Sequence, residues 1–229
     1  MTSPIVLFDV DATLLYSGGA GSLAMRRAFT KLYGVDDAFA RVEFTGRTDW
    51  SILRDALREH RLLDGKPFEE EMARFLETYL ALLEPTLREV EGGRVMPGVP
   101  ELLAALAGRQ GARLGLATGN FRQACFIKLR HFGLDAHLRE GGFGDDAEDR
   151  GELVRVAIER VANGTPARSG EVWIIGDTVL DVAAARTNNA RALAVATGST
   201  PPEALRAAGA HAVLDDLSDT EAILRLLLA

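Results

Sequence analysis

Short apolar runs, each ending in a polar cluster or a glycine, recur along the chain. Such runs are typical of strands that are buried on both faces of a parallel sheet. The expected strands are residues 5–8, 112–117, 171–175 and 190–195, with a weaker one at 211–214. Apolar residues at helical spacing lie between them, as in the pattern formed by Phe121, Cys125, Leu129 and Phe132. The alternation predicts an α/β fold, an open parallel sheet with helices on both faces.

The stretch from residue 16 to residue 90 differs, because it contains no convincing strand. Apolar spacing predicts three helices there. The first is lined by Met25, Ala28, Phe29 and Leu32, the second by Trp50, Leu53 and Leu57, and the third by Phe68, Met72, Phe75, Leu76, Tyr79 and Leu83. We expect an all-helical insertion at 16–90, joined through linkers at 15–19 and 91–98 to a core formed by residues 1–15 and 91–229.

Composition narrows the class of protein. Of the 229 residues 47% are hydrophobic and 26% charged, which excludes disorder for most of the chain. The net charge of −7, with no basic block, argues against nucleic-acid and membrane-surface partners. The single cysteine, Cys125, excludes an internal disulfide and is compatible with a reducing compartment. With no signal-like start and no apolar run near the ~20 residues that span a bilayer, we expect a cytoplasmic protein.

Two aspartates, Asp9 and Asp11, follow the first predicted strand. In an open parallel sheet, ligands bind at the carboxyl ends of the strands. Two carboxylates this close repel each other unless a cation or a shared proton relieves them, and Mg²⁺ takes oxygen ligands of this kind. The alternative is a pair of solvated side chains at the start of a loop.

A second acidic pair follows the predicted strand 171–175. Asp177 comes directly after its end, and Asp181 lies about one turn into the next helix. Together with the first pair, these aspartates indicate a Mg²⁺ site at one edge of the sheet. The alternative is that Asp177 or Thr178 only caps the helix, a common use of both residue types.

The predicted strand 112–117 ends in Thr118, Gly119 and Asn120 and leads into a helix. A hydroxyl and backbone N–H groups at a helix N-terminus bind anions, and a glycine allows close backbone approach. By itself the segment favours the alternative, an ordinary strand-to-helix turn.

Taken in order, these segments resemble the motifs of the haloacid dehalogenase-like hydrolase superfamily. The matching stretches are Asp-x-Asp-x-Thr at 9–13, Thr-Gly-Asn at 118–120 and Gly-Asp-Thr-x-x-Asp at 176–181. The resemblance is to the phosphatase branch with a helical cap, as in phosphoglycolate phosphatase-like members, and it covers nearly the whole chain. It implies a Rossmann-like catalytic core and identifies the insertion at 16–90 as the cap domain.

The chain departs from the family pattern at two positions. Ala12 stands where the family usually has glycine, which we expect to strain the turn modestly. The third family motif is normally a lysine shortly before a helix, and the corresponding stretch offers Arg150 instead. An arginine binds phosphate well, but its planar fork is not a compact ammonium. Lys128 is a rival for this role, but it lies in the middle of a predicted helix and is expected at the surface.

The resemblance implies hydrolysis of a phosphate ester through an aspartyl-phosphate. Asp9 would be the nucleophile, and Asp11 would protonate the leaving oxygen and then deprotonate the attacking water. The ligands of Mg²⁺ would be the Asp9 carboxylate, the Asp11 backbone carbonyl and Asp177, with Asp181 as a further ligand. Thr118 and Arg150 would be catalytic residues that hold the phosphoryl oxygens, and the amides of Gly119 and Asn120 would bind the substrate.

The predicted cap carries Thr-Gly-Arg-Thr-Asp at 45–49, which resembles a stretch in caps of phosphoglycolate phosphatase-like and phosphoglucomutase-like members. Arg47 could bind a substrate carboxylate or a second anion, and Asp49 could cap the helix that follows. The alternative is an arginine at an ordinary helix start.

The expected partner is a small phosphorylated metabolite, which the sequence does not name; the oligomeric state is also open. Asp11 favours phosphate chemistry over carbon–halogen cleavage, because the dehalogenase branch does not carry an aspartate there. Two alternatives remain: a phosphomutase of the same superfamily, and a regulatory protein that binds phosphate or Mg²⁺ without turnover.

Overall fold

The computed structural model describes residues 4–108, 112–165 and 170–228, and its largest sheet is parallel throughout. From one edge to the other, the strands are β5 (Gly141–Gly142), β4 (Arg113–Ala117), β1 (Ile5–Phe8), β6 (Val172–Gly176), β7 (Arg191–Val195) and β8 (Ala212–Leu214). The chain order reverses at β1, which pairs with β4 on one side and β6 on the other. Ligands bind at such a switch point in open α/β sheets.

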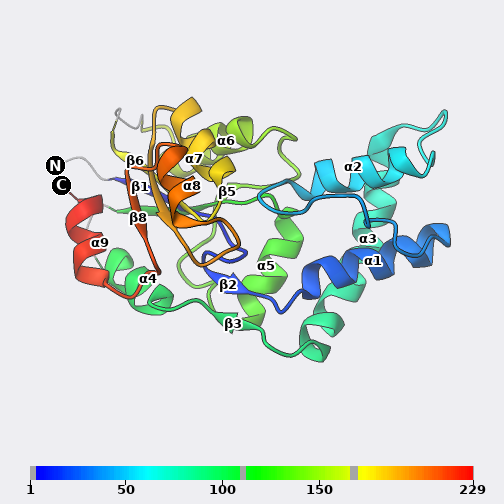
Figure 1. Ribbon diagram of the computed structural model, residues 1–229, viewed down its shortest axis with the longest axis horizontal. Helices are drawn as coiled ribbons and strands as arrows, with labels where there is room; N and C mark the ends of the chain where they lie inside the picture. The colour runs from blue at the N-terminus through cyan, green and yellow to red at the C-terminus, as the bar shows by residue number, and fades with distance from the viewer. Residues whose placement is uncertain (1–3, 109–111, 166–169, 229) are drawn as a thin grey trace.

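Helices cover both faces of this sheet (Figure 1). In chain order, the helices of the described residues are α1 (Ala20–Tyr33), α2 (Asp49–Glu59), α3 (Phe68–Glu89), α4 (Val99–Ala107), α5 (Arg122–His131), α6 (Arg150–Ala162), α7 (Val179–Thr187), α8 (Pro202–Ala207) and α9 (Thr220–Leu227). Successive side chains of β1 point to opposite faces of the sheet, and each face is covered by a different set of helices. Val6 and Phe8 pack with α4, α5 and α9, while Ile5 and Leu7 pack with α6, α7 and α8. The predicted α/β class, with a Rossmann-like core, is confirmed.

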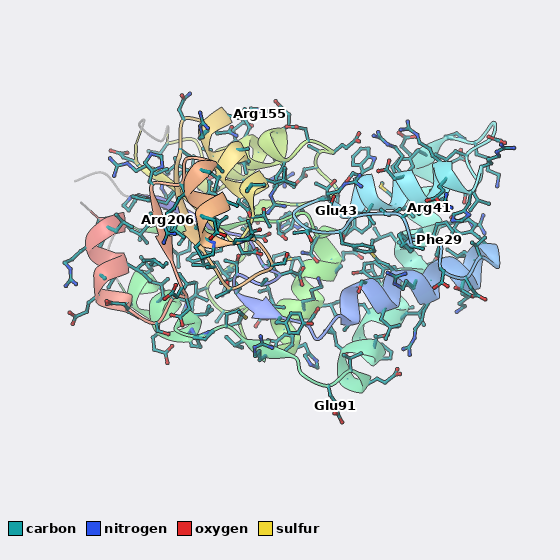
Figure 2. All side chains as sticks on the ribbon, in the orientation of Figure 1. Phe29, Arg41, Glu43, Glu91, Arg155 and Arg206 are labelled. Atoms are coloured by element: carbon teal, nitrogen blue, oxygen red, sulfur yellow. The ribbon has the colours of Figure 1, made fainter. Side chains whose placement is uncertain are left out.

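Helices α1, α2 and α3 form a separate apolar cluster beside the sheet (Figure 1). Phe29 of α1, labelled in Figure 2, packs against Phe75 of α3 with ring centroids 6.3 Å apart. The cluster also takes in Phe121 and Ala124 at the start of α5, so α5 lies between the sheet and the helical segment. The three helices expected between residues 16 and 90 are present; the exact domain boundaries stay a prediction.

Three short strands were not predicted. β2 (Leu15–Tyr16) and β3 (Arg94–Val95) pair antiparallel, and they lie inside the two segments expected to be linkers. The paired strands bring the two ends of the helical segment together. β5 consists of Gly141 and Gly142 alone, which gives no apolar run to recognise. Within the described part of the chain, no helix is long and apolar enough to cross a membrane.

Candidate active site

The residues predicted to carry chemistry meet at one edge of the sheet. Asp9 directly follows β1, Thr118 follows β4 and Asp177 follows β6. All three line a cavity of about 580 Å³. The opposite wall comes from the helical segment, with residues that include Gly21, Met25, Phe44, Ile52 and Tyr79. The cavity therefore lies between the sheet and the helical segment at residues 16–90, which we call the cap.

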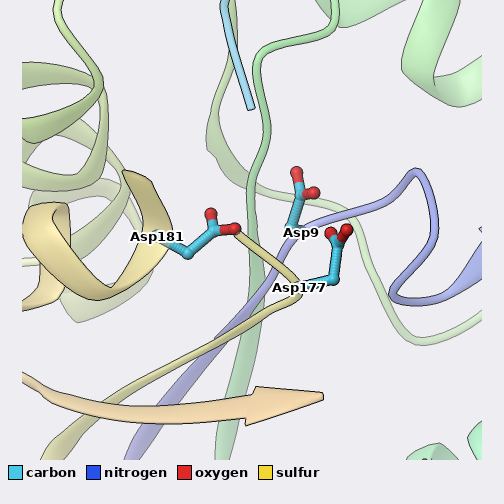
Figure 3. A group of neighbouring side chains, drawn as sticks. All are labelled: Asp9, Asp177 and Asp181. Atoms are coloured by element: carbon cyan, nitrogen blue, oxygen red, sulfur yellow. The ribbon is translucent and has the colours of Figure 1, made fainter. Parts of the chain in front are cut away.

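Asp9, Asp177 and Asp181 form a compact acidic cluster, and Asp9 and Asp177 line this cavity. One carboxylate oxygen from each lies within 4.8 Å of the others, and Figure 3 shows the three side chains converging. The residues are exposed by only 6, 4 and 3%. Oxygen donors at this spacing suit a hard divalent cation such as Mg²⁺. The donor set therefore fits the metal expected from the sequence.

The electrostatics of the cluster point the same way. Burial raises the pKa of the Asp9 carboxyl, and Asp181 and Asp11 add to the shift while Arg150 opposes it. The pKa of Asp177 is also raised, mainly by burial and then by the negative charges of Asp9 and Asp181. Since both shifts mean that the ionised carboxylates are destabilised, a cation placed among them would be strongly favoured.

Arg150, the first residue of α6, is buried behind the acidic cluster. Its Nε and Nη2 donate to Asp181 Oδ1 at 2.9 and 2.5 Å, and Nη2 lies 2.9 Å from Asp9 Oδ1. Further bonds run to the backbone carbonyls of Gly46 and Ala117. The negative charges around it raise the pKa of the guanidinium despite burial. Arg150 thus lies where the sequence comparison expected the third motif, in contact with the proposed nucleophile.

Asp181 serves two structural contacts at once. Its Oδ1 accepts from Arg150, and its Oδ2 accepts from the backbone N–H and hydroxyl of Thr178, which caps α7 in return. The alternative interpretation of this motif as a helix cap is therefore also correct. Residues 176–181 thus contain both the capping box of α7 and two of the three aspartates of the acidic cluster.

Asp11 lies on the other side of the cavity mouth, and its partner was not expected. Lys128 Nζ donates to Asp11 Oδ2 at 2.6 Å and to Asn120 Oδ1 at 2.5 Å. Asn120 Nδ2 also donates to Asp11 Oδ2, at 2.8 Å. Lys128 is 4% exposed, so the prediction of a surface lysine was wrong. It is buried because the cap covers the side of α5 that faces away from the sheet.

The Thr118–Asn120 turn is held tightly against the cap. Thr118 Oγ1 accepts from Asn120 Nδ2 at 2.8 Å. A β-carbon at Gly119 would lie 2.2 Å from the carbonyl oxygen of Arg47, so only glycine permits this approach. The expected close backbone contact at position 119 is present, but it is made with the cap loop.

Asp49 fixes the cap loop to this turn. Its backbone N–H donates to the Gly119 carbonyl at 2.7 Å, and its carboxylate accepts from the Phe121 N–H at 2.9 Å. Thr48, and not Asp49, caps α2. Burial, opposed in part by Lys128, raises the pKa of Asp49 to about 7. No local sequence signal indicated this contact, because an aspartate at a helix start ordinarily caps its own helix.

Arg47 lines the cavity, and its Nη2 donates to Asp55 of α2 at 2.6 Å. The side chain is therefore within reach of a ligand but already paired.

Ala12 adopts the left-handed region at φ 60°, which costs a non-glycine residue about 1–2 kcal/mol. The strain expected in the turn after Asp9 is thus present.

Comparison with known proteins agrees with this geometry. The family model described as haloacid dehalogenase-like hydrolase matches residues 6–186, which is most of the chain. The chain belongs to the haloacid dehalogenase-like hydrolase family. It is 28% identical over 222 residues to a plasmid-encoded phosphoglycolate phosphatase of Cupriavidus necator, covering 96% of this chain and 92% of the relative.

Solved structures share the fold of this hydrolase. A hydrolase from Pseudomonas syringae superposes with a TM-score of 0.70 at 23% identity, covering 99% of each chain. A predicted phosphatase from Clostridium acetobutylicum has a TM-score of 0.70 at 21% identity, covering 98% of this chain and all of the other. At these identities the likeness establishes the fold alone.

Proposed function

We propose that this hydrolase is a Mg²⁺-dependent phosphatase that cleaves a small phosphate monoester through an aspartyl-phosphate on Asp9. One observation carries the proposal. Asp9 lies at the switch point of the sheet, in a buried cluster with Asp177 and Asp181, and opens onto a cavity that Asp11 also lines. The name of the Cupriavidus relative supports the phosphoester class.

Asp9, Asp177 and the backbone carbonyl of Asp11 would hold the metal. Bound Mg²⁺ supplies positive charge that offsets the repulsion between an anionic nucleophile and an anionic phosphate. Both oxygens of Asp181 already accept hydrogen bonds, so Asp181 supports the site mainly through the position that it gives to Arg150.

The chain's own residues account for the bonds and protons. The Asp9 carboxylate attacks phosphorus, the ester P–O bond breaks, and Asp11 gives a proton to the leaving oxygen. A water molecule then attacks the phosphorus of the aspartyl-phosphate, and its proton passes to Asp11. Inorganic phosphate leaves and the Asp9 carboxylate is regenerated. Thr118 and the amides of Gly119 and Asn120 would bind the phosphoryl oxygens during both steps.

The cap would select the leaving group and exclude water. A cavity of about 580 Å³, with Met25, Phe44 and Ile52 on the cap side, suits a small metabolite. Phosphoglycolate is the substrate named for the relative and enters here as the first ester to try. A cytoplasmic location stays a prediction from the sequence.

The test is hydrolysis of p-nitrophenyl phosphate and a panel of small phosphate esters, with Mg²⁺ and with a chelator. We expect activity only with Mg²⁺. Asp9→Asn should reduce turnover to background, and Asp11→Asn should lower kcat by about 10²–10⁴-fold. Asp135→Asn, at an exposed position away from the cavity, is the matched control and should leave turnover unchanged.

Undiminished phosphatase activity of Asp9→Asn, in protein free of contaminants, would refute the assignment. A hexose 1-phosphate belongs in the panel because it separates hydrolysis from phosphomutase chemistry. Release of inorganic phosphate supports the hydrolase, whereas an isomeric sugar phosphate supports the mutase. Metal and phosphate binding without turnover on any ester would favour the regulatory alternative.

A further inference from the structure

Lys128 is a buried cation that the family motifs do not account for. It projects from the middle of α5 and lines the cavity. On the cap side it meets α1, where a β-carbon at Gly21 would lie 3.1 Å from Nζ and 3.8 Å from the Tyr79 hydroxyl. The ammonium therefore occupies a slot between core and cap that a glycine keeps open.

The described residues do not use all of the N–H donors of the Lys128 ammonium. An ammonium group carries three N–H donors. Among the described residues, its acceptors are Asp11 Oδ2 and Asn120 Oδ1. One donor therefore remains for a ligand, and the cavity that Lys128 lines is the space next to it. A buried charged donor is costly to leave unused, so an acceptor delivered by a ligand would bind there favourably.

Arg150 differs in this respect, because the protein itself uses most of its N–H groups. Nε and Nη2 bond Asp181, Nη2 also reaches Asp9 and the Ala117 carbonyl, and Nη1 bonds the Gly46 carbonyl. The guanidinium thus fixes carboxylates and the cap loop. Of these two buried cations, Lys128 has fewer protein acceptors among the described residues, with two side-chain oxygens for its ammonium, and it also lines the cavity.

We propose that Lys128 is a catalytic residue that donates to a phosphoryl oxygen of the substrate, while Arg150 fixes the nucleophile. The single lysine of the family's third motif is replaced here by two cations from different helices. The proposal rests on the proposed function only in taking a phosphoryl group as the ligand. Lys128 also ties Asp11 and Asn120 to the same ammonium, so the phosphoryl group and the acid–base residue share one positive charge.

Calorimetric titration with inorganic phosphate in the presence of Mg²⁺ tests this without requiring turnover. Lys128→Met keeps an unbranched side chain, one atom shorter than lysine, and removes the charge. We expect phosphate affinity to fall about ten- to a hundredfold, the loss that follows from one charge-assisted hydrogen bond. Lys31→Met, an exposed lysine of α1, is the matched control and should bind phosphate like the wild type.

The same substitution in an Asp11→Asn background separates direct contact from an effect through Asp11. A direct contact predicts that Lys128→Met still weakens phosphate binding when the ion pair with Asp11 is absent, although the fold loss need not be equal because the two residues are in contact. Loss of the effect in the Asp11→Asn background would overturn the proposal, as would a folded Lys128→Met protein that binds phosphate as tightly as the wild type.

Gly21→Ala keeps the experiment decisive if Lys128→Met does not fold. Alanine favours the helix, so its methyl group disturbs the ammonium without weakening α1. We expect a several-fold loss of phosphate affinity, and unchanged affinity would count against the proposal. If phosphate binding depends on Lys128 but no ester is hydrolysed, the proposed function fails while this inference holds. If esters are hydrolysed but Lys128→Met binds phosphate like the wild type, this inference fails while the proposed function holds.

Discussion

Arg150 allows two carboxylates to be buried side by side, and this gives a quantitative prediction. Its side chain is 8% exposed, and those of Asp9 and Asp181 are 9 and 4% exposed. Arg150→Met retains much of the volume but leaves both carboxylates without their cation. Removing one partner of a buried ion pair costs about 3–5 kcal/mol. We expect the free energy of unfolding of the metal-free protein to fall by about that amount.

Arg155→Met is the matched control on the same helix. Arg155 lies at the surface (Figure 2) and pairs with Glu152 and Glu159 at 2.9 and 2.6 Å. Its side chain is 49% exposed, and water and salt screen exposed ion pairs so that they contribute little to stability. The expected loss for Arg155→Met is therefore much smaller than the loss for Arg150→Met.

The assay is urea-induced unfolding with a chelator present, followed by the same measurement in Mg²⁺. A ligand that binds only the folded state stabilises it by mass action. Because Arg150→Met leaves the acidic cluster more negative, we expect Mg²⁺ to stabilise this variant more than the wild type. Equal stability of Arg150→Met and Arg155→Met without metal would refute the reasoning, since it would mean that the two buried carboxylates do not need the guanidinium.

Two further substitutions test buried carboxylates. Since burial raises the pKa of Asp49 to about 7, its ionised form is disfavoured in the folded state, and this residue makes the protein less stable as pH rises from about 4 to about 7. Asp49→Asn keeps an acceptor for the Phe121 N–H, so urea unfolding at about pH 5 and about pH 8 should differ less than in the wild type; an unchanged difference would contradict this. Asp177→Asn should raise the thermal unfolding temperature of the metal-free protein and abolish the stabilisation by Mg²⁺, and a variant that Mg²⁺ still stabilises would show that Asp177 is not a ligand.

The sheet and its motif loops were predictable because each signal is local. A four-residue apolar run followed by Asp9 specifies both a buried strand and the polar edge where it ends. The same holds for the strand before Asp177. The parallel arrangement then brings these ends together without knowledge of any other contact. The short pairs β2–β3 and β4–β5 lack such a signal, since their pairing depends on where the flanking segments place the backbone.

Lys128 and Asp49 were misjudged for the opposite reason, because their surroundings come from distant parts of the chain. Lys128 lies three residues after Cys125 and seven after Phe121, so it falls on the apolar side of α5. The expected surface position followed from the residue type alone, since a lysine in the middle of a helix normally reaches solvent. The cap covers the side of α5 that faces away from the sheet, and this contact between distant segments is known only from the structure. Asp49 likewise bonds a turn that lies 72 residues away in the sequence. Contacts of this kind leave no periodicity to read.

The ion pairs of the site are distributed unequally, and the difference bears on where the proposed Mg²⁺ would bind. Asp9 has Arg150 and Asp11 has Lys128, whereas Asp177 has no cationic side chain within ion-pair distance among the described residues. Its bond from the Thr13 hydroxyl, 3.3 Å long, is a weak substitute for a positive charge. The folded chain thus pairs the proposed nucleophile and the proposed acid–base residue with cations of its own. Asp177, whose only role in the proposed reaction is to hold Mg²⁺, has no such partner among the described residues, so we expect the affinity for the metal and the instability without it to have the same origin.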